Sequence, residues 1–366
     1  MTRFRHSLVL GKFYPPHAGH HHLVRAAAAR SDRTTVAVLG SSVESIPLAD
    51  RVSWLAAEHA GDPGVAVVGD LDDHPMDFED DAVWELHVGV TRSVLARRAI
   101  LDGDPTGAPV DAVFSSEAYG DELAKRLGAE HVAVDPARSA FPVSGTAVRT
   151  DPVANWHHLA PATRRGLAAR IVVVGAESSG TTTLSRALAA ELGAPWVPEY
   201  GRRHTELKLA AAKAFDPAND IDGLVWTVGD FVDVALRQQI DEDAAVTGPV
   251  LVCDNDAWAA TVWGHRYLGA PHHDIAPNAR KPALYLLTDH VGVPFEQDGW
   301  RDGEHLRERM TGWFTAGLAE RGVPWRLLTG THGERLAQAV AAAGEVLAEH
   351  FRFAKPKQAP EIGRRG

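Results

Sequence analysis

The 366-residue sequence has a single cysteine, Cys253, so no disulfide can form within one chain. No apolar run approaches the roughly 18 residues that a membrane-spanning helix needs. Basic residues are fewer than acidic ones, 37 against 48, and the net charge of -11 argues against a general nucleic-acid surface. The N-terminus also lacks a basic leader followed by an apolar signal segment. We therefore expect a cytoplasmic protein that binds neither membrane nor nucleic acid and meets its anionic ligands at local sites.

The remaining composition is that of a globular protein, with 45% hydrophobic and 23% charged residues. The length predicts about two domains, each large enough to bury its own core. A boundary falls between 151 and 169, where two prolines and a polar segment precede a new apolar run. We expect domains at 1–160 and 168–352, and a disordered tail at 354–366, which is rich in Pro, Lys, Arg and Gly.

Apolar runs alternate with helical patterns in both halves, which is typical of βαβ units around a parallel sheet. In the first half the expected strands are 7–10, 35–39, 65–68, 110–115 and 131–134. The expected helices there are 49–59, 82–98, 118–127 and one that begins near His20. In the second half the expected strands are 170–174, 250–253, 283–288 and 325–328, and the expected helices are 182–192, 203–215, 222–246, 304–321 and 333–351.

The segment GKFYPPHAGHHHLV, from Gly11 to Val24, carries the pattern GxFxPxHxGH, which is typical of nucleotidyl transfer. Its glycines and prolines force a turn between a buried strand and a helix, so phosphates meet a helix N-terminus. His17 and His20 stand there and can each donate a hydrogen bond to a phosphate oxygen. We expect them to stabilise charge that grows on ATP as its α-phosphorus is attacked. A metal-binding tract or a solvated loop is the alternative, but it leaves the Gly and Pro spacing unexplained.

A second segment, VSGTAVRTDP at 143–152, resembles the SxTxxR motif of adenylyltransferases that make dinucleotide cofactors. In that motif the Ser, the Thr and a helix N-terminus bind phosphate, and the Arg neutralises the departing pyrophosphate. The matching residues are Ser144, Thr146 and Arg149. Alone, the segment also fits an ordinary helix start with Ser144 as N-cap, but its pairing with the first motif favours a phosphate site.

The second half opens with GAESSGTTTL at 175–184, which fits the phosphate-loop frame GxxxxGK[ST] except that Thr181 occupies the lysine position. In the full motif, backbone amides wrap the phosphates, the lysine reaches the β- and γ-phosphates, and the next hydroxyl holds magnesium. The missing ammonium weakens transition-state stabilisation unless another cation replaces it. The candidate cations are Arg186, Arg202, Arg203 and Arg301. A non-functional Gly-rich turn is the alternative.

Three downstream segments fit a kinase. VLVCDND, at 250–256, is an apolar strand that ends at Asp254 and Asp256, as expected of a carboxylate that orients magnesium, although an Asp that caps the next helix also fits. Glu199 follows a short strand, where small-molecule kinases often carry the carboxylate that accepts the substrate hydroxyl proton. QDGWRDG supplies Asp298 and Arg301 in a Gly-rich loop that fits a closing lid or a plain surface turn.

Taken in order, these segments resemble the NadR family, bifunctional proteins with an N-terminal nicotinamide mononucleotide adenylyltransferase and a C-terminal ribosylnicotinamide kinase. The resemblance rests on GKFYPPHAGHHHL, VFSSEAYG, VSGTAVRTDP, NWHHL, GAESSGTTTL, PEYGRRH, VCDND and QDGWR, and covers nearly the whole chain. It implies an α/β fold, with a Rossmann-like HxGH nucleotidyltransferase domain followed by a P-loop kinase-like α/β domain. Enterobacterial members carry a DNA-binding helix-turn-helix ahead of the first motif, for which this sequence has no room.

By this resemblance the first half transfers an adenylyl group from ATP to nicotinamide mononucleotide, giving NAD and pyrophosphate. The residues implied for ATP binding are Gly11, Lys12, Phe13, His17, His20, Ser144, Thr146 and Arg149. The second half phosphorylates nicotinamide riboside with ATP, and Glu199 or Asp254 lies nearest the proton transfer. The residues implied for this ATP site are Gly175, Glu177, Ser178, Ser179, Gly180, Thr181, Thr182, Thr183 and Arg301, with Mg²⁺ on Thr182 and Asp254. Three aromatic residues either stack on substrate rings or pack in the core: Trp156, Trp258 and Trp263.

Other classes stay open at this stage. One is an adenylyltransferase whose lysine-less kinase half only binds nucleotide and senses its level. Another is a nucleotidyltransferase for pantetheine phosphate or cytidylyl transfer, fused to an unrelated kinase. A DNA-binding repressor is disfavoured by the acidic charge. A homo-oligomer is compatible with the sequence.

Overall fold

The computed structural model describes residues 3–77, 79–104, 107, 109–296 and 303–357. The chain forms two compact units, one made of residues 1–167 and 352–366 and the other of residues 168–351. It therefore passes into the second unit after Leu167 and returns to the first unit after Phe351. Within the described ranges, no helix is long and apolar enough to cross a membrane.

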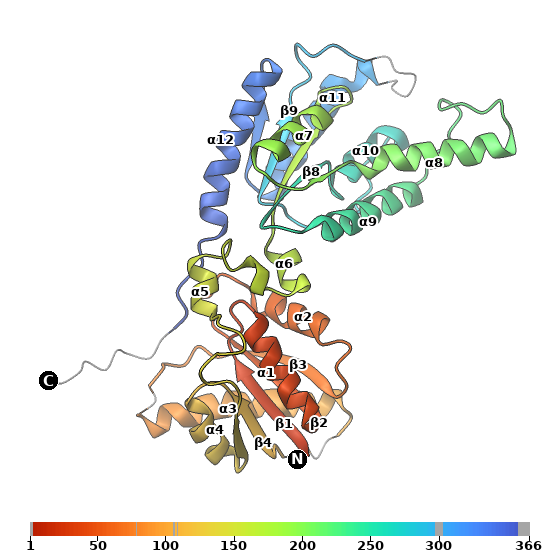
Figure 1. The fold of residues 1–366 in the computed structure, drawn as a ribbon. Helices are drawn as coiled ribbons and strands as arrows, with labels where there is room; N and C mark the ends of the chain where they lie inside the picture. The colour runs from red at the N-terminus through yellow and green to blue at the C-terminus, as the bar shows by residue number, and fades with distance from the viewer. Residues whose placement is uncertain (1–2, 78, 105–106, 108, 297–302, 358–366) are drawn as a thin grey trace. The chain divides into compact units, whose positions relative to one another are not determined.

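The first unit is built on a parallel five-stranded sheet with the order β3-β2-β1-β4-β5 (Figure 1). Because β1 lies between β2 and β4, the strand order reverses beside β1, and ligands bind at such a point in open α/β sheets. The strands are β1 (Phe4–Gly11), β2 (Ser31–Gly40), β3 (Val65–Leu71), β4 (Ala112–Ser115) and β5 (Glu130–Ala133). The helices are α1 (Ala18–Ala29), α2 (Leu48–Glu58), α3 (Asp81–Leu101), α4 (Tyr119–Leu127), α5 (Gly145–Thr150), η1 (Trp156–His158) and α6 (Pro161–Leu167).

Helices cover both faces of this sheet. Successive strand residues point to opposite faces, and the apolar ones on each face pack against a helix. Val9 packs in the core with Leu23 and Val24 of α1, whereas its neighbour Leu8 packs with Val88 of α3. Both β1 side chains are fully buried. This packing fixes β1, and with it the loop that carries the first motif.

The second unit has its own parallel five-stranded sheet, with the order β10-β9-β6-β8-β7. Its strands are β6 (Ala169–Gly175), β7 (Trp196–Val197), β8 (Val250–Asp254), β9 (Leu284–Thr288) and β10 (Trp325–Leu328). Its helices are α7 (Thr181–Glu191), α8 (Tyr200–Phe215), α9 (Val228–Ala245), α10 (Ala259–Leu268), η2 (Glu304–Leu306), α11 (Arg307–Arg321) and α12 (His332–His350). Val173 of β6 is in register with Asp254 of β8, so the ends of these strands lie side by side.

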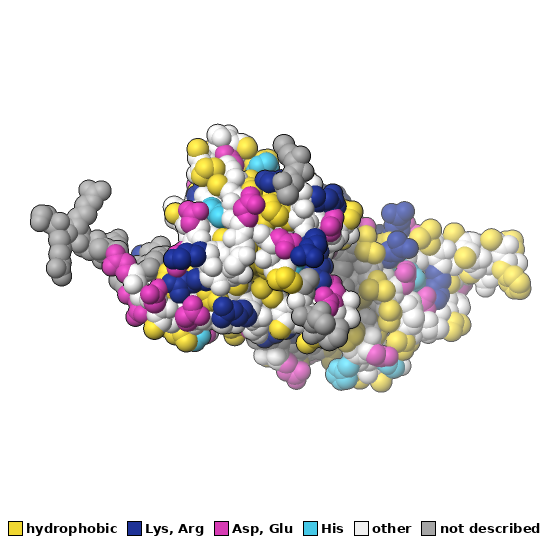
Figure 2. Space-filling model, turned by 90° about the horizontal axis from the view of Figure 1, so that it is seen from below, with side chains coloured by type: hydrophobic (Ala, Val, Ile, Leu, Met, Phe, Trp, Pro, Cys, Tyr) yellow, Lys and Arg dark blue, Asp and Glu magenta, His cyan; other side chains and the backbone are white. Residues whose placement is uncertain are grey.

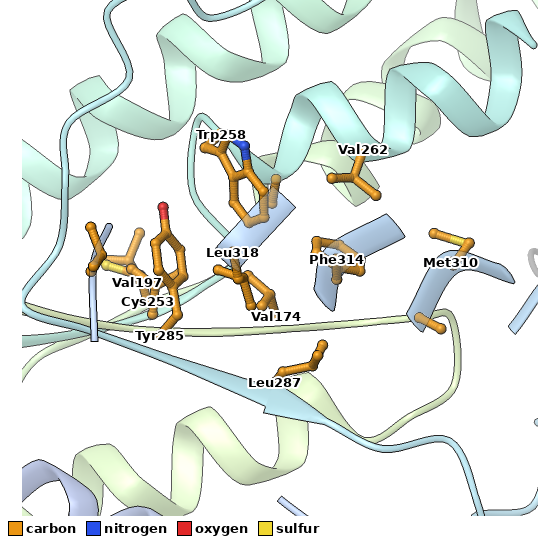
Figure 3. Close-up of a cluster of buried hydrophobic side chains, with 14 of the residues drawn as sticks. Val174, Val197, Cys253, Trp258, Val262, Tyr285, Leu287, Met310, Phe314 and Leu318 are labelled. Carbon is orange, nitrogen blue, oxygen red and sulfur yellow. The ribbon is translucent and has the colours of Figure 1, made fainter. Parts of the chain in front are cut away.

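One core of this unit is formed by β-strand side chains against α10 and α11 (Figure 3). It contains Trp258, Tyr285 and Phe314, with the thiol of Cys253 buried beside them. Cys253 is a core residue, and its burial raises the pKa of the thiol. Trp258 is likewise a core residue and does not line the cavity described below. Trp263, by contrast, does line that cavity. In the first unit, Trp156 is also buried.

Two expectations about the chain's organisation differ from the structure. Residues 161–167, placed in the boundary by sequence, form α6 and belong to the first unit, where Gly166 packs so closely on Trp54 of α2 that a Cβ would overlap the indole. The expected disorder from Ala354 onward is wrong for 354–357. Ala354 exchanges hydrogen bonds with Ser45 and Tyr14, and Lys357 bonds to the loop after β3. The rest of the tail lies outside the described residues.

Figure 2 shows basic and acidic side chains intermixed over the described part of one face. A continuous basic field, which phosphate-backbone binding needs, is not visible on that face. This pattern agrees with the acidic net charge of the whole sequence.

Candidate functional sites

The first motif spans the end of β1 and the start of α1, as the Gly and Pro pattern predicts. His17 is the N-cap of α1, and its backbone N–H donates to Nδ1 of His20 over 3.3 Å. The two imidazoles stack with 3.7 Å between ring centroids. Phe13 is buried, has a left-handed φ of 47°, and packs its ring against His20. The structure therefore gathers both histidines at a helix N-terminus, where unpaired amides favour anions.

Both imidazoles are neutral at neutral pH. Burial, reinforced by nearby imidazoles and Arg138, lowers the pKa of His17 to about 3 and that of His20 well below its usual value. A neutral ring still donates one N–H to a phosphate oxygen. Among the residues described, no cluster of three or more His, Cys, Asp or Glu side chains is placed to hold a metal ion.

The second motif lies against the first. Ser144 is the N-cap of α5, and its Oγ accepts a hydrogen bond from the backbone of Ala147. Arg149 donates to the carbonyl oxygen of Tyr14 at 2.5 Å and to Oγ1 of Thr146 at 3.1 Å. Its guanidinium also lies over the Tyr14 ring, 5.0 Å from the centroid. Arg149 and Tyr14, which are 135 residues apart in sequence, thus join the two motifs in one cationic corner.

Lys12 is held beside this corner by groups that the sequence did not point to. Its ammonium lies 3.3 Å from Oε1 of the buried Glu44 and donates to the carbonyl oxygen of Lys357 over 3.0 Å. Arg51, which is 1% exposed, donates to both Glu44 and the Lys12 carbonyl oxygen. Gly11 ends β1 directly before Lys12. The buried Glu44 and Arg51 pair therefore fixes the loop at the end of β1.

In the second unit, the phosphate loop joins β6 to α7. A Cβ on Gly175 would overlap the hydroxyls of Thr288 and Ser179, so only glycine fits there. Gly180 has a φ of 89° and is the N-cap of α7. The Ser179 hydroxyl is used internally, donating to the Ala176 carbonyl oxygen at 2.6 Å. The Glu177 carboxylate is paired with Arg266 at 3.0 Å, so this loop offers an anion mainly its backbone amides.

Thr182 and Asp254 meet at the ends of α7 and β8, as the phosphate-loop and strand motifs predict. The Thr182 hydroxyl donates to Oδ2 of Asp254 at 2.5 Å. Burial and the nearby charge of Glu199 raise the pKa of Asp254 to about 7. Glu199 is the residue at the N-cap position of α8, and its carboxylate accepts a hydrogen bond from the side-chain amide of Asn255 at 2.8 Å. The sequence did not identify Asn255, which has a left-handed φ of 62°.

A cavity of about 1010 Å³ opens beside this loop. Residues 176–184 of the phosphate loop and α7 line it, together with Glu199, Arg202 and Asn255. Part of its wall is aromatic: the Trp226 and Tyr267 rings lie 4.9 Å apart, and Phe231 lies 5.6 Å from Trp226. Anion-binding amides and an aromatic wall in one cavity suit a phosphate donor beside a ring-bearing acceptor.

The proposed substitutes for the loop lysine are placed differently. Arg202 lines the cavity, whereas Arg186 lies over the Trp196 ring and Arg203 is exposed. Arg301 and Asp298 lie outside the described residues. Sequence reasoning missed Arg307 and Arg335, which are buried and donate to the carbonyl oxygens of Ser178 and Ser179.

Opposite pH responses are expected for the two units. The pKa of His17 falls to about 3 and that of His21 to about 4 on folding, so the unfolded chain binds more protons below pH 6.5 and acid destabilises the first unit. The pKa of Asp254 rises to about 7 and that of Glu242 to about 8, so acid stabilises the second unit until the unfolded carboxyl pKa is reached. Each buried group contributes about 1 to 3 kcal/mol between pH 7.5 and 5.5.

Calorimetric melts at pH 7.5 and 5.5 check this expectation. One transition should move to lower temperature in acid and the other to higher temperature. Asp254→Asn should reduce the acid stabilisation of the second transition only, since asparagine does not titrate. Two transitions that shift together would contradict the assignment.

Comparisons with known proteins agree with this organisation. A family model described as an AAA domain matches residues 170–335. Two relatives named trifunctional NAD biosynthesis/regulator protein NadR, from Salmonella typhimurium and Escherichia coli K12, are each 23% identical over 310 and 311 residues, respectively. These matches cover 80% of this chain and 71% of each relative.

Two solved structures share the fold over almost the whole chain. The NadR protein in complex with NR has a TM-score of 0.63 and 21% identity, covering 94% of this chain and 97% of that one. The NadR protein in complex with NAD and AMP-PNP has a TM-score of 0.61 and 20% identity, covering 95% and 97%. The chain is a homologue of the NadR family, with an AAA domain in its C-terminal half.

Proposed function

We propose that this protein makes NAD by two ATP-dependent reactions, phosphorylation of nicotinamide riboside in the second unit and adenylyl transfer to nicotinamide mononucleotide in the first. The observation that carries the proposal is the cationic corner of the first unit. There Arg149 of the second motif bonds to Tyr14 of the first, beside the stacked His17 and His20.

In the adenylyl transfer, a phosphate oxygen of nicotinamide mononucleotide attacks the α-phosphorus of ATP. A new P–O bond forms as the bond between the α-phosphorus and the bridging oxygen breaks, and the electron pair leaves with pyrophosphate. His17 and His20 donate neutral N–H groups to the triphosphate, and Arg149 and Lys12 supply positive charge. Ser144 and Thr146 anchor phosphate at the start of α5. Catalysis is then positioning and electrostatic stabilisation, without a covalent enzyme intermediate.

In the phosphoryl transfer, the riboside 5′ hydroxyl attacks the γ-phosphorus and releases ADP. Glu199 is the better proton acceptor of the two candidate carboxylates, because it lines the cavity, whereas Asp254 is fully buried and bonded to Thr182. The aromatic wall formed by Trp226, Phe231 and Tyr267 suits the pyridine ring of the riboside.

Thr182 and Asp254 fit a bound Mg²⁺. Oδ1 of Asp254 is buried and has no hydrogen-bond partner among the described residues, so an oxygen ligand remains for a hard cation. A hydroxyl and a carboxylate are few ligands, which suits Mg²⁺ because it keeps waters and takes its other ligands from substrate phosphates. Thr182 and Asp254 would hold the ion, which would supply positive charge against the negative charge of the ATP phosphates.

Chromatographic product analysis tests the proposal. The full chain, with ATP and Mg²⁺, should convert nicotinamide mononucleotide to NAD, and nicotinamide riboside to the mononucleotide and then to NAD. Conversion of the mononucleotide but not the riboside would favour a kinase half that only binds nucleotide. If Thr181→Lys then gains riboside phosphorylation, the second unit is a relic that needs its lysine. Inactivity on both pyridine substrates would favour another nucleotidyltransferase.

Two ATP sites per chain are expected, since each unit has its own phosphate motif at the carboxyl end of a central strand. Isothermal titration with a non-hydrolysable ATP analogue should find two equivalents. Arg149→Ala should weaken one class of site and Thr182→Ala the other. A stoichiometry of one for the intact chain would show that one motif is vestigial.

A further inference from the structure

The phosphate loop has no cation of its own, because Thr181 stands at the lysine position. The triphosphate of ATP carries several negative charges, and backbone amides alone leave them without a countercharge. Positive charge in direct contact with this loop comes from two arginines elsewhere in the second unit.

Arg335, on the first turn of α12, is one such group. It is 4% exposed and makes four hydrogen bonds, all to backbone carbonyl oxygens. Nη1 donates to the Ser179 carbonyl oxygen at 3.2 Å and to that of Asp289 at 2.7 Å. Arg335 also lines the cavity beside the phosphate loop. Its charge is thus buried against the loop and borders the cavity proposed to hold the nucleotide.

Arg307, at the start of α11, holds the preceding peptide. Its Nη2 donates to the Ser178 carbonyl oxygen at 3.0 Å, and its Nη1 donates to that of Val293 at 2.9 Å. It is 7% exposed. Two guanidinium groups therefore contact two successive carbonyl oxygens of the phosphate loop.

This arrangement strengthens the amides on the other side of the loop. The carbonyl of Ser179 and the N–H of Gly180 belong to one planar trans peptide and point in opposite directions. A guanidinium on the carbonyl polarises that peptide and makes its N–H a stronger donor. The N-terminal amides of α7, an eleven-residue helix, lie beside it and add their partial positive charge. Charge buried at this depth is costly, and a bound anion would offset the cost.

We propose that Arg307 and Arg335 together replace the missing lysine, as positioning residues that present the phosphate loop and its positive charge to the triphosphate. The inference rests on the proposed kinase function of this unit and names the groups that let the unit work with threonine in the loop. Arg335 should contribute more than Arg307 to ATP binding, because it lines the cavity and Arg307 does not.

The test measures binding of AMP-PNP to the full chain by titration calorimetry with saturating NAD, alongside the KM for ATP in riboside phosphorylation. The variants are Arg335→Gln, Arg335→Lys, Thr181→Lys, and Arg335→Gln combined with Thr181→Lys. Adenylyl transfer by the first unit is the internal control for intact protein, and a thermal melt reports folding of the second unit.

Arg335→Gln should weaken AMP-PNP binding and raise the KM for ATP at least tenfold, with kcat changed less and adenylyl transfer unchanged. Adding Thr181→Lys should restore binding to within about threefold of the natural protein, because the ammonium returns the lost charge. Arg335→Lys should also keep binding within about threefold. If Arg335→Gln does not fold, this lysine variant and the matching Arg307→Lys carry the test.

The inference is overturned if folded Arg335→Gln binds AMP-PNP within twofold of the natural protein, or if Thr181→Lys does not rescue it. It is also overturned if a folded lysine variant loses affinity, since charge would then not be the property that matters. Arg335-dependent AMP-PNP binding without riboside phosphorylation would leave the inference standing and defeat the kinase function. Unchanged AMP-PNP binding together with active riboside phosphorylation would overturn the inference and leave the kinase function standing.

Discussion

Replacing His20 or Arg149 by alanine is expected to lower NAD synthesis from nicotinamide mononucleotide by about 10²-fold to 10³-fold, the usual cost of removing one preorganised donor from a developing charge. His20 stacks on His17 at the N-terminus of α1, and Arg149 bridges the two motifs through Tyr14. Neither side chain is part of the hydrophobic core, so the melting temperature should change little. Initial rates of NAD formation at saturating ATP check the expectation.

His22→Ala is the matched control, because it removes a neighbouring imidazole from the same helix and leaves the motif intact. It should keep NAD synthesis near that of the natural protein. If His20→Ala retains most of its activity, or His22→Ala loses as much, the HxGH assignment fails for this chain. The neutral state of His17 and His20 adds a further constraint: their titration should not shape the rate profile between pH 6 and 8, because the pKa of His17 is about 3 and that of His20 is also strongly lowered.

The positions of the longer strands follow from local signals, and so they could be predicted from sequence. Buried parallel strands are apolar throughout, which makes runs such as those of β6 and β9 visible without any tertiary information. The start of α9 was predicted six residues too early, at 222. Thr227 and Asp230 form a capping box there, a signal present in the sequence but hidden by the apolar residues before it. The short α10 was not predicted at all.

The site residues were predictable where a motif names them and unpredictable where burial gives them their role. His17, His20 and Thr182 lie in patterns whose spacing has a chemical reason. Arg51 and Arg335 resemble ordinary surface arginines on amphipathic helices, because nothing local says that their side chains turn inward to backbone carbonyl oxygens. Long-range polar contacts of this kind depend on the packed fold, and a single sequence does not contain that information.

The C-terminal segment shows the same limit. Its composition is that of a solvated tail, and the sequence predicted disorder. Residues 353–357 instead pack on the first unit, where the Phe353 ring meets Tyr14 and the Lys357 carbonyl oxygen accepts from Lys12. Composition indicates whether a segment can form its own core, but it does not indicate whether an existing protein surface can order that segment.

The largest effect on the second unit is expected from Asp254→Asn, which should abolish most riboside phosphorylation and leave NAD synthesis from the mononucleotide unchanged. Asparagine keeps the size of the side chain and can still bond to Thr182, but it cannot offer an anionic oxygen to Mg²⁺. Glu199→Gln should lower the same reaction by about 10²-fold to 10⁴-fold, as expected for loss of a proton acceptor.

The pH dependence of riboside phosphorylation tests the role of Asp254 as a magnesium ligand. Burial raises the pKa of Asp254 to about 7, so at low Mg²⁺ phosphorylation should fall as the pH drops from 8 to 6 and Asp254 takes up a proton. Raising the Mg²⁺ concentration should move that fall to lower pH, because the cation competes with the proton for one carboxylate. The measurement is the rate of mononucleotide formation across pH at two Mg²⁺ concentrations. A profile unmoved by Mg²⁺, or an Asp254→Asn variant with near-natural turnover, would remove Asp254 from the metal site.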